Sequence, residues 1–255
     1  MALIPNPTVA PLADPQGPQP WQDIGVVCPF DMALDHELWR WMPEGVNLVF
    51  TRTPYYDQPV GLDMAEEISD HGEIQDAVRS LVAIRPAVVT YACTSGSFVH
   101  GVEGARKLSA AMVSAGAPAA VTTSEGLLMA LDALGVSRVA VATPYLAELT
   151  NRLTSFLEQG GKSVVSHEGL GLDRDIWTVP YATTCGLIRQ ADRPDAEAVF
   201  VSCTNLPTYG LIAYMERELG KPVITANQVT AWSGLRLMGR EAVGPEQLLV
   251  QAAAK

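Results

Sequence analysis

The sequence is poor in basic residues and has no long hydrophobic run. Its 255 residues contain 17 Lys and Arg against 28 Asp and Glu, which gives a formal net charge of −11. So acidic a chain repels phosphate backbones, which disfavours nucleic acid as a partner. The longest uncharged stretch of note, 108–124, is broken by Gly116 and Pro118, so we expect neither a membrane span nor a membrane partner.

Cysteine is also scarce, with 4 in the chain. Residues 1–20 lack the basic start and apolar centre of a signal peptide, and so few cysteines without an export signal do not indicate a disulfide framework. We therefore expect a soluble, cytoplasmic protein with reduced thiols. The histidines show no metal-ligand spacing with cysteine or carboxylate, and no GxGxxG follows a strand, so we expect no metal and no dinucleotide cofactor.

Hydrophobic residues make up 48% of the chain, which is enough for a large core. From Trp21 onward, short β-branched runs alternate with longer helical patterns, which is typical of an α/β fold with a largely parallel sheet. The expected strands are 24–28, 46–51, 87–92, 119–122, 139–143, 163–167, 198–202 and 223–226. The expected helices include 63–84, 102–116, 124–135, 146–160 and 211–220.

A long-range repeat divides the chain. The strand that delivers Cys93-Thr94 is echoed 110 residues later by one that delivers Cys203-Thr204, and the flanking strands repeat at similar offsets. The repeat predicts two similar Rossmann-like parallel-sheet halves related by pseudo-twofold symmetry, with the active site in the cleft between them. We expect an irregular Pro-rich arm at 1–20, a first half at 21–122 and 223–255, and a second half at 123–222.

The paired thiols of Cys93 and Cys203 are the candidate catalytic groups. A thiol between a strand and a helix meets the helix dipole and free N–H groups, which lower its pKa. With one thiol on each side of a planar carbon, one can remove a proton or add as a nucleophile while the other protonates the opposite face. Such a pair fits racemisation, epimerisation, decarboxylation or double-bond isomerisation, and it needs neither metal nor organic cofactor. The expected substrate-binding donors beside the thiols are Thr94, Ser95, Thr204 and Asn205.

Each candidate also has a structural interpretation. A cysteine at a strand end is often a small buried hydrophobe, which is the interpretation we favour for Cys28 and Cys185. Tyr145 follows a strand and could either aim its hydroxyl into the cleft or pack in the core. Asp31 could line the cleft as a substrate-binding residue or cap a helix at 31–42.

Three segments carry a family resemblance: Tyr91-Ala-Cys93-Thr-Ser-Gly-Ser97, Ala142-Thr-Pro-Tyr145 and Val201-Ser-Cys203-Thr-Asn205. They resemble the aspartate/glutamate/hydantoin racemase superfamily, in the branch with maleate cis–trans isomerase and arylmalonate decarboxylase. The resemblance covers about 24–239. Within the branch, the sequence is most similar to the maleate-isomerase-like proteins of ectoine utilisation. It shares with them Cys-Thr-Ser-Gly-Ser, an Asp after the first strand, and a late Asn-Gln-x-x-x-Trp, here Asn227-Gln228 and Trp232.

The resemblance implies roles for the matching positions. In maleate isomerases the cysteine matching Cys93 adds to the alkene carbon, and the one matching Cys203 supplies or removes the proton. The resemblance also implies that Thr94, Ser95, Tyr145 and Thr204 bind a substrate carboxylate and that the chain forms a homo-oligomer. Arylmalonate decarboxylases carry only the later cysteine, so an earlier one argues against that activity.

Asp31 departs from the family pattern, because maleate isomerases carry an asparagine in the turn after the first strand. An aspartate would repel a dicarboxylate and could instead hold an ammonium group. The sequence therefore predicts a cofactor-independent, two-cysteine isomerase that acts on a small carboxylic acid, similar to maleate cis–trans isomerase. The alternative is an amino-acid or hydantoin racemase, and weaker alternatives are a decarboxylase and a non-enzymatic small-acid-binding protein.

Overall fold

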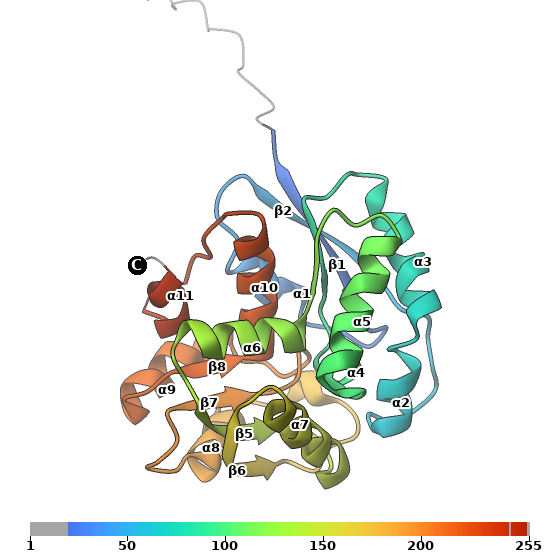
Figure 1. The fold of residues 1–255 in the computed structure, drawn as a ribbon. Helices are drawn as coiled ribbons and strands as arrows, with labels where there is room; N and C mark the ends of the chain where they lie inside the picture. The colour runs from blue at the N-terminus through green and yellow to red at the C-terminus, as the bar shows by residue number, and fades with distance from the viewer. Residues whose placement is uncertain (1–19, 245, 254–255) are drawn as a thin grey trace, which may run out of the picture.

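The structure, a computed structural model, describes residues 20–244 and 246–253 (Figure 1). The Pro-rich arm expected at 1–20 therefore lies outside the described residues, except for Pro20. The strands are β1 (Gln22–Cys28), β2 (Val46–Arg52), β3 (Val88–Tyr91), β4 (Ala120–Thr122), β5 (Arg138–Thr143), β6 (Ser163–Gly169), β7 (Ala198–Val201) and β8 (Val223–Thr225).

Helices follow most of the strands. They are α1 (Asp35–Trp39), α2 (Leu62–Glu67), α3 (His71–Val82), α4 (Thr94–Phe98), α5 (Gly101–Ser114), α6 (Thr123–Ala133), α7 (Ala147–Gln159), α8 (Tyr181–Ala191), α9 (Ile212–Leu219), α10 (Ala226–Leu237) and α11 (Leu248–Ala253). Short 3₁₀ turns occur at η1 (Ile176–Thr178) and η2 (Tyr209–Leu211). This alternation confirms the α/β class.

The described strands form two 4-stranded parallel sheets with the same order, β2-β1-β3-β4 and β6-β5-β7-β8. The central strands β3 and β7 are short apolar runs in which every residue is buried, as expected where helices cover both faces of a parallel sheet. Because parallel strands share one carboxyl edge, the segments after β1, β3, β5 and β7 are the natural lining of a site between the sheets.

The helix that follows each sheet packs against the core of the other half. The helix α6 follows the first sheet, yet its Leu127 and Leu131 belong to the apolar cluster that contains β5 and β7. The helix α10 follows the second sheet, yet its Ala231 and Leu235 pack in the cluster that contains β1. The two helices cross in contact with each other (Figure 1). At the contact the hydroxyls of Thr123 and Thr230 are hydrogen-bonded, with their oxygens 2.6 Å apart. The halves therefore share their cores.

The boundaries differ from the expected ones in two places. The strand Val223–Thr225, which we expected in the first half, pairs with β7 in the second sheet, so the chain returns to the first half only with α10. The helix expected at 63–84 is two helices, α2 and α3, because Asp70 starts a new helix by accepting a hydrogen bond from the backbone of Glu73. A capping box formed by Thr122 and Glu125 starts α6.

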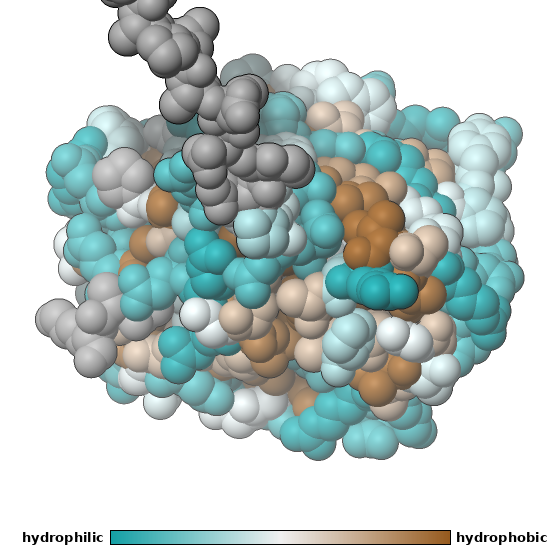
Figure 2. All heavy atoms as spheres, turned by 90° about the horizontal axis from the view of Figure 1, so that it is seen from above, coloured by the Kyte–Doolittle hydropathy of each residue, from teal (hydrophilic) through white to brown (hydrophobic). Residues whose placement is uncertain are grey.

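Hydrophilic side chains cover much of the face seen from above, with separate hydrophobic patches between them (Figure 2). No helix among the described residues has the length and apolar character that crossing a membrane requires. The described part of the chain also contains no cluster of three or more His, Cys, Asp or Glu residues placed to hold a metal ion.

Candidate active site

A small cavity lies at the carboxyl ends of the central strands, between the two halves. The structure brings all the residues singled out from the sequence to its wall: Asp31, Cys93, Thr94, Ser95, Tyr145, Cys203, Thr204 and Asn205. The side chains come from four strand ends, two in each sheet. Their contact with one cavity follows from the repeat, because equivalent strand ends of two facing halves meet across the pseudo-twofold axis.

Cys93 lies directly before the short helix α4, in extended conformation. Its sulfur accepts a hydrogen bond from the backbone N–H of Gly96 at 3.4 Å, and it lies 3.7 Å from the hydroxyl oxygen of Ser95. Gly96 itself is required by packing, because a Cβ there would collide with the hydroxyl of Tyr91. The Cys-Thr-Ser-Gly segment is therefore built so that a backbone N–H reaches the thiol.

Cys203 differs from Cys93 in its local structure, although the sequence repeat predicts the same setting. No α-helix follows it directly; a turn and η2 separate it from α9. Its backbone has φ of +85°, a left-handed conformation that a residue with a Cβ adopts only under strain. The sulfur accepts a hydrogen bond from the N–H of Asn205 at 3.4 Å. The expectation of a second helix N-terminus at this thiol is therefore wrong, and a strained turn takes its place.

The thiol pKa values also differ from the expected ones. Burial raises the pKa of Cys93 to about 11, although the hydrogen bonds from Gly96 and Ser95 act in the opposite direction. Burial raises the pKa of Cys203 to about 12, and the negative charge of Asp31 adds to the increase. The expected lowering is wrong because desolvation of a thiolate in this closed site outweighs the few N–H donors. Both thiols are therefore protonated at neutral pH in the closed site.

Asp31 belongs to the loop after β1 and does not cap a helix. The helix α1 begins after Leu34, and no side chain caps it. Burial raises the pKa of the Asp31 carboxyl. Asn205 holds this loop: its amide nitrogen donates to the carbonyl of Asp31, and its amide oxygen accepts from the N–H of Ala33, each at 2.9 Å. The side chain of Asn205 thus positions a first-half loop against the turn of Cys203.

The hydroxyl of Thr94 is buried, lines the cavity and has no hydrogen-bond partner among the described residues. An unpaired buried hydroxyl is costly, which points to a polar ligand atom as its partner. The hydroxyl of Tyr145 is also buried beside the cavity and accepts a hydrogen bond from Ser202 at 3.3 Å. These groups are suited to orient a substrate carboxylate.

Sequence reasoning missed the apolar wall of the cavity, which consists of Pro29, Val60, Met64, Ile68 and Ile176. These residues lie on loops and helices remote from the thiols in sequence, and no local pattern marks them. The backbone N–H of Val60 donates to the carbonyl of Asp173 at 2.8 Å, which ties a first-half loop to a second-half loop beside the cavity. The enclosed space is about 20 Å³, room for about one water molecule. A substrate can enter only if these loops part.

A buried carboxylate supports the loop that follows Cys203. Glu37 is 2% exposed and accepts hydrogen bonds from the backbone N–H groups of Thr208 and Tyr209 and from the side-chain amide of Asn227. The side-chain amide of Gln228 instead donates to the side-chain oxygen of Gln247, which also accepts a hydrogen bond from the Trp41 indole. The late Asn-Gln pair therefore connects α10 to neighbouring elements and does not line the thiol cavity.

The comparisons with known proteins agree on one family. The sequence model described as "Amdase: Arylmalonate decarboxylase" matches residues 55–249. Arylmalonate decarboxylase from Bordetella bronchiseptica is 33% identical over 186 residues, which cover 71% of this chain and 75% of that protein. Maleate isomerase from Nocardia farcinica is 30% identical over 159 residues, which cover 59% of this chain and 63% of that protein.

Solved structures give the same result for the fold. A liganded double mutant of arylmalonate decarboxylase, with one glycine changed to cysteine and one cysteine to serine, has a TM-score of 0.82 at 28% identity, covering 89% of this chain and 98% of that one. An alanine variant of the maleate isomerase from Pseudomonas putida S16, with maleate, also has a TM-score of 0.82, at 21% identity, covering 91% and 98%. The second likeness supports the fold alone. With the family model matched over most of the sequence, the chain belongs to the arylmalonate decarboxylase (Amdase) family.

Proposed function

We propose that this protein is a cofactor-independent isomerase that acts on a small carboxylic acid, with Cys93 as nucleophile and Cys203 as acid and base. One observation carries the proposal: two thiols, one from each half, line the same closed cavity. The chemistry of such a pair is complete without a further group, because one sulfur can form a bond to carbon while the other moves the proton.

The proposed reaction starts with a thiolate at Cys93. Its sulfur forms a bond to an alkene carbon, and the π electrons move to the neighbouring carbon and its carboxylate, giving an enolate. The thiol of Cys203 protonates that carbon, which leaves a single bond free to rotate. The reverse steps, in which Cys203 takes the proton back and the carbon–sulfur bond breaks, release the trans isomer. In this route Thr94 and Tyr145, which line the cavity, hold the carboxylate on which negative charge develops.

A relative supports the covalent step. One solved structure of Nocardia farcinica maleate cis–trans isomerase, a cysteine-to-serine mutant, contains a covalently bound succinylcysteine intermediate. The protonated state of Cys203, whose pKa is raised to about 12, suits the acid role. Cys93 must lose its proton before it adds, and opening of the closed site to water would make that loss easier because hydration stabilises the thiolate.

Decarboxylation is the second candidate, because the family model and the relative with 33% identity are both arylmalonate decarboxylases. In that reaction the carbon–carbon bond to one deprotonated carboxylate breaks and that group leaves as carbon dioxide. The bonding electron pair stays on the α-carbon as an enolate, which takes its proton from the thiol of Cys203. Cys93 has no covalent part in this route. The two candidates therefore differ in whether the earlier thiol bonds to carbon.

Proton NMR in D₂O distinguishes the candidates when the reduced protein is incubated in turn with maleate, an arylmalonate and a panel of amino acids and N-acetylated diamino acids. Isomerisation gives a new alkene signal, and decarboxylation gives an arylacetate. Racemisation gives the enantiomer, which has the same spectrum, so it is detected as loss of the Cα proton signal by exchange with deuterium. In the proposed route, Cys203→Ala accumulates a substrate mass adduct on Cys93, and Cys93→Ala forms none. A double Cys93→Ala, Cys203→Ala variant with unchanged turnover would exclude both candidates and the racemase.

A further inference from the structure

A second cavity adjoins the thiol cavity, and we call it the vestibule. It encloses about 170 Å³ and shares the residues Asp31, Val60, Met64 and Ile176 with the thiol cavity. The remaining vestibule residues are Phe30, Tyr55, Tyr56, Asp57, Gln58, Asp173, Arg174, Asp175 and Trp177. The first half contributes the loop before α2, and the second half contributes the loop around η1. Once these loops part, a molecule that reaches the thiols can therefore extend into the vestibule between them.

Aromatic side chains form much of the vestibule wall. The ring of Phe30 packs edge-on against Tyr55 and Tyr56, with centroid distances of 5.3 and 6.1 Å. The hydroxyl of Tyr56 is bound by Glu73, which fixes that ring in place. The rings of Tyr55 and Trp177 remain 73% and 40% exposed. Exposed aromatic faces beside a concave surface are the groups that bind organic cations through the ring quadrupole.

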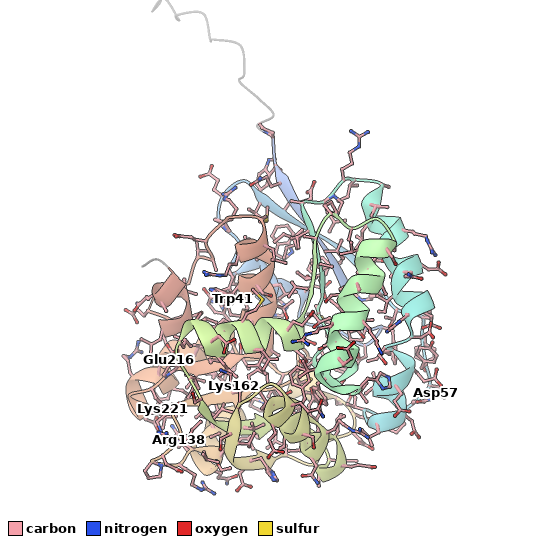
Figure 3. The ribbon with its side chains drawn as sticks, viewed as in Figure 1. Trp41, Asp57, Arg138, Lys162, Glu216 and Lys221 are labelled. Atoms are coloured by element: carbon pink, nitrogen blue, oxygen red, sulfur yellow. The ribbon has the colours of Figure 1, made fainter. Side chains whose placement is uncertain are left out.

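The charges of the vestibule have mostly one sign. Four carboxylates line it, those of Asp31, Asp57, Asp173 and Asp175, against the single guanidinium of Arg174. Among the ion pairs of the described residues, none involves Asp57, Asp173 or Asp175. Figure 3 shows Asp57 at the outer edge beside α2. With four carboxylates against one guanidinium, negative charge is in excess in the vestibule, and this excess favours a cation over an anion there.

We propose that the vestibule binds the cationic end, an ammonium or alkylated ammonium group, of a substrate whose carboxylate lies in the thiol cavity. The inference rests on the proposed function, since it extends the same site. The unpaired, buried hydroxyl of Thr94 is independent evidence that the inner cavity takes a polar ligand atom. A substrate of this kind is a zwitterion longer than a four-carbon diacid: its carboxylate meets hydroxyl and N–H donors, and its cation meets carboxylates and aromatic rings.

Three matched probes test the proposal by isothermal titration calorimetry with the intact protein. They are hexanoate with a terminal trimethylammonium group, the same acid with a terminal tert-butyl group of equal shape, and the corresponding dicarboxylate. We expect the cationic probe to bind about tenfold more tightly than the neutral one, and the dicarboxylate to bind most weakly. Equal binding of the cationic and neutral probes would overturn the proposal. Tighter binding of the dicarboxylate would overturn it too, because it would show that the vestibule binds an anion at the guanidinium of Arg174.

Charge-neutralising variants localise the effect. The double variant Asp57→Asn, Asp173→Asn should lose the preference for the cationic probe and keep its affinity for the neutral one. Asp195→Asn removes the same kind of exposed charge before β7, at the opposite ends of the strands, and should keep the preference. If Asp195→Asn also lost the preference for the cationic probe, the preference would depend only on the net charge of the protein. That result would overturn the assignment of cation binding to the vestibule.

Alkylation of Cys93 by iodoacetamide separates failure of this inference from failure of the proposed function. If the neutral acid protects the thiol as well as the cationic acid does, the vestibule proposal fails and the thiol site stands. If no carboxylic acid protects the thiol, the proposed function itself fails, and the vestibule proposal fails with it.

Discussion

At the scale of single residues, the candidate site is defined by what surrounds its thiols. Asp31 lines the same cavity as both thiols. Burial is the main cause of the raised pKa of Cys93 and of Cys203, and the negative charge of Asp31 adds to the increase. A thiolate beside a carboxylate is disfavoured by like-charge repulsion. The same carboxylate adjoins the vestibule, so one residue acts both on the reactivity of the thiols and on the charge of the substrate that can approach them.

Asp31→Asn should therefore lower the pKa of both thiols. Because the thiolate fraction rises with pH below the pKa, wild-type kcat/KM should increase up to about tenfold per pH unit between about pH 7 and pH 10 if the free enzyme must form the thiolate. In Asp31→Asn the same rise of kcat/KM with pH should occur at lower pH. The pH dependence of the iodoacetamide alkylation rate, followed separately at Cys93 and Cys203 by peptide mass spectrometry, reports the two pKa values. An unchanged titration would contradict the assigned role of the aspartate charge.

The left-handed backbone of Cys203 gives a second prediction at this scale. Alanine and glycine both remove the thiol, but only glycine adopts a φ of +85° without a steric cost. Cys203→Gly should therefore be more stable than Cys203→Ala by about 1 kcal/mol in urea unfolding. At Cys93, where φ is −142°, the order should be reversed. If the glycine and alanine variants had the same order of stability at both positions, the turn at Cys203 would be shown to relax and to hold no strain.

At the scale of secondary-structure elements, buried polar groups fix the short helices. Glu216 on α9 is buried and accepts hydrogen bonds from the backbone N–H groups of Val223 and Leu248, so it connects α9 to β8 and to the start of α11. Figure 3 shows Glu216 at the left of the view, beside α9. Burial raises its pKa to about 7, although the two N–H groups act in the opposite direction.

The raised pKa of Glu216 makes stability depend on pH. Its folded pKa is about 7 against 4.5 for the ordinary group, so between these values the folded state keeps a proton that the unfolded state has lost. Raising the pH across this window should therefore reduce the free energy of unfolding, by at most about 1.4 kcal/mol per pH unit. Glu216→Gln should flatten this slope in urea unfolding, whereas Glu103→Gln, an exposed change on α5, should leave it. A wild-type slope of the opposite sign would contradict the assignment.

Close contact between α6 and α10 depends on a glycine. A Cβ on Gly126 would lie 2.6 Å from the hydroxyl oxygen of Ser233 and 2.9 Å from the carbonyl of Val229. Gly126→Ala should therefore destabilise the protein by about 1–3 kcal/mol. Gly186 in the middle of α8 has no neighbour within 4 Å of its Cβ position, so Gly186→Ala should stabilise by about 0.5–1 kcal/mol. Two equal changes in melting temperature would contradict the helix contact.

The sequence permits prediction of the strands and of the residues at their ends, because both depend on local pattern. Runs such as Val88–Tyr91 are short, apolar and followed by small polar residues, so the edge at which they meet could be inferred. The apolar wall with Val60 and Ile176 could not, because only tertiary packing brings these loops together. The conformation of Cys203 and the net effect of burial on the thiols likewise depend on the assembled cavity.

At the scale of the whole molecule, the exchange of α6 and α10, in which each helix packs in the core of the other half, joins the halves into one folding unit. Each sheet is covered by a helix that leaves the other sheet, so neither half has a complete core alone. The ectoine relation, the homo-oligomer and the cytoplasmic location stay predictions from the sequence.

Thermal unfolding should accordingly be a single cooperative transition. Differential scanning calorimetry should give equal calorimetric and van't Hoff enthalpies under reversible, reducing conditions, because loss of one half uncovers the other. Leu235→Ala removes a side chain of α10 from the first-half core, and it should lower the whole transition without splitting it. Two resolved transitions, in the wild type or in this variant, would show that the halves unfold independently.

The same exchange constrains how the chain can change over evolutionary time. A substitution on α10 alters the packing of Ile24 and its neighbours in the first sheet, and one on α6 alters the packing of β5 and β7 in the second. A compensating substitution must then arise in the half against which the helix packs. Among homologous sequences, covariation should therefore link Ala231 and Leu235 with the first half. It should likewise link Leu127 and Leu131 with the second half, so that the two copies of the repeat could not diverge independently.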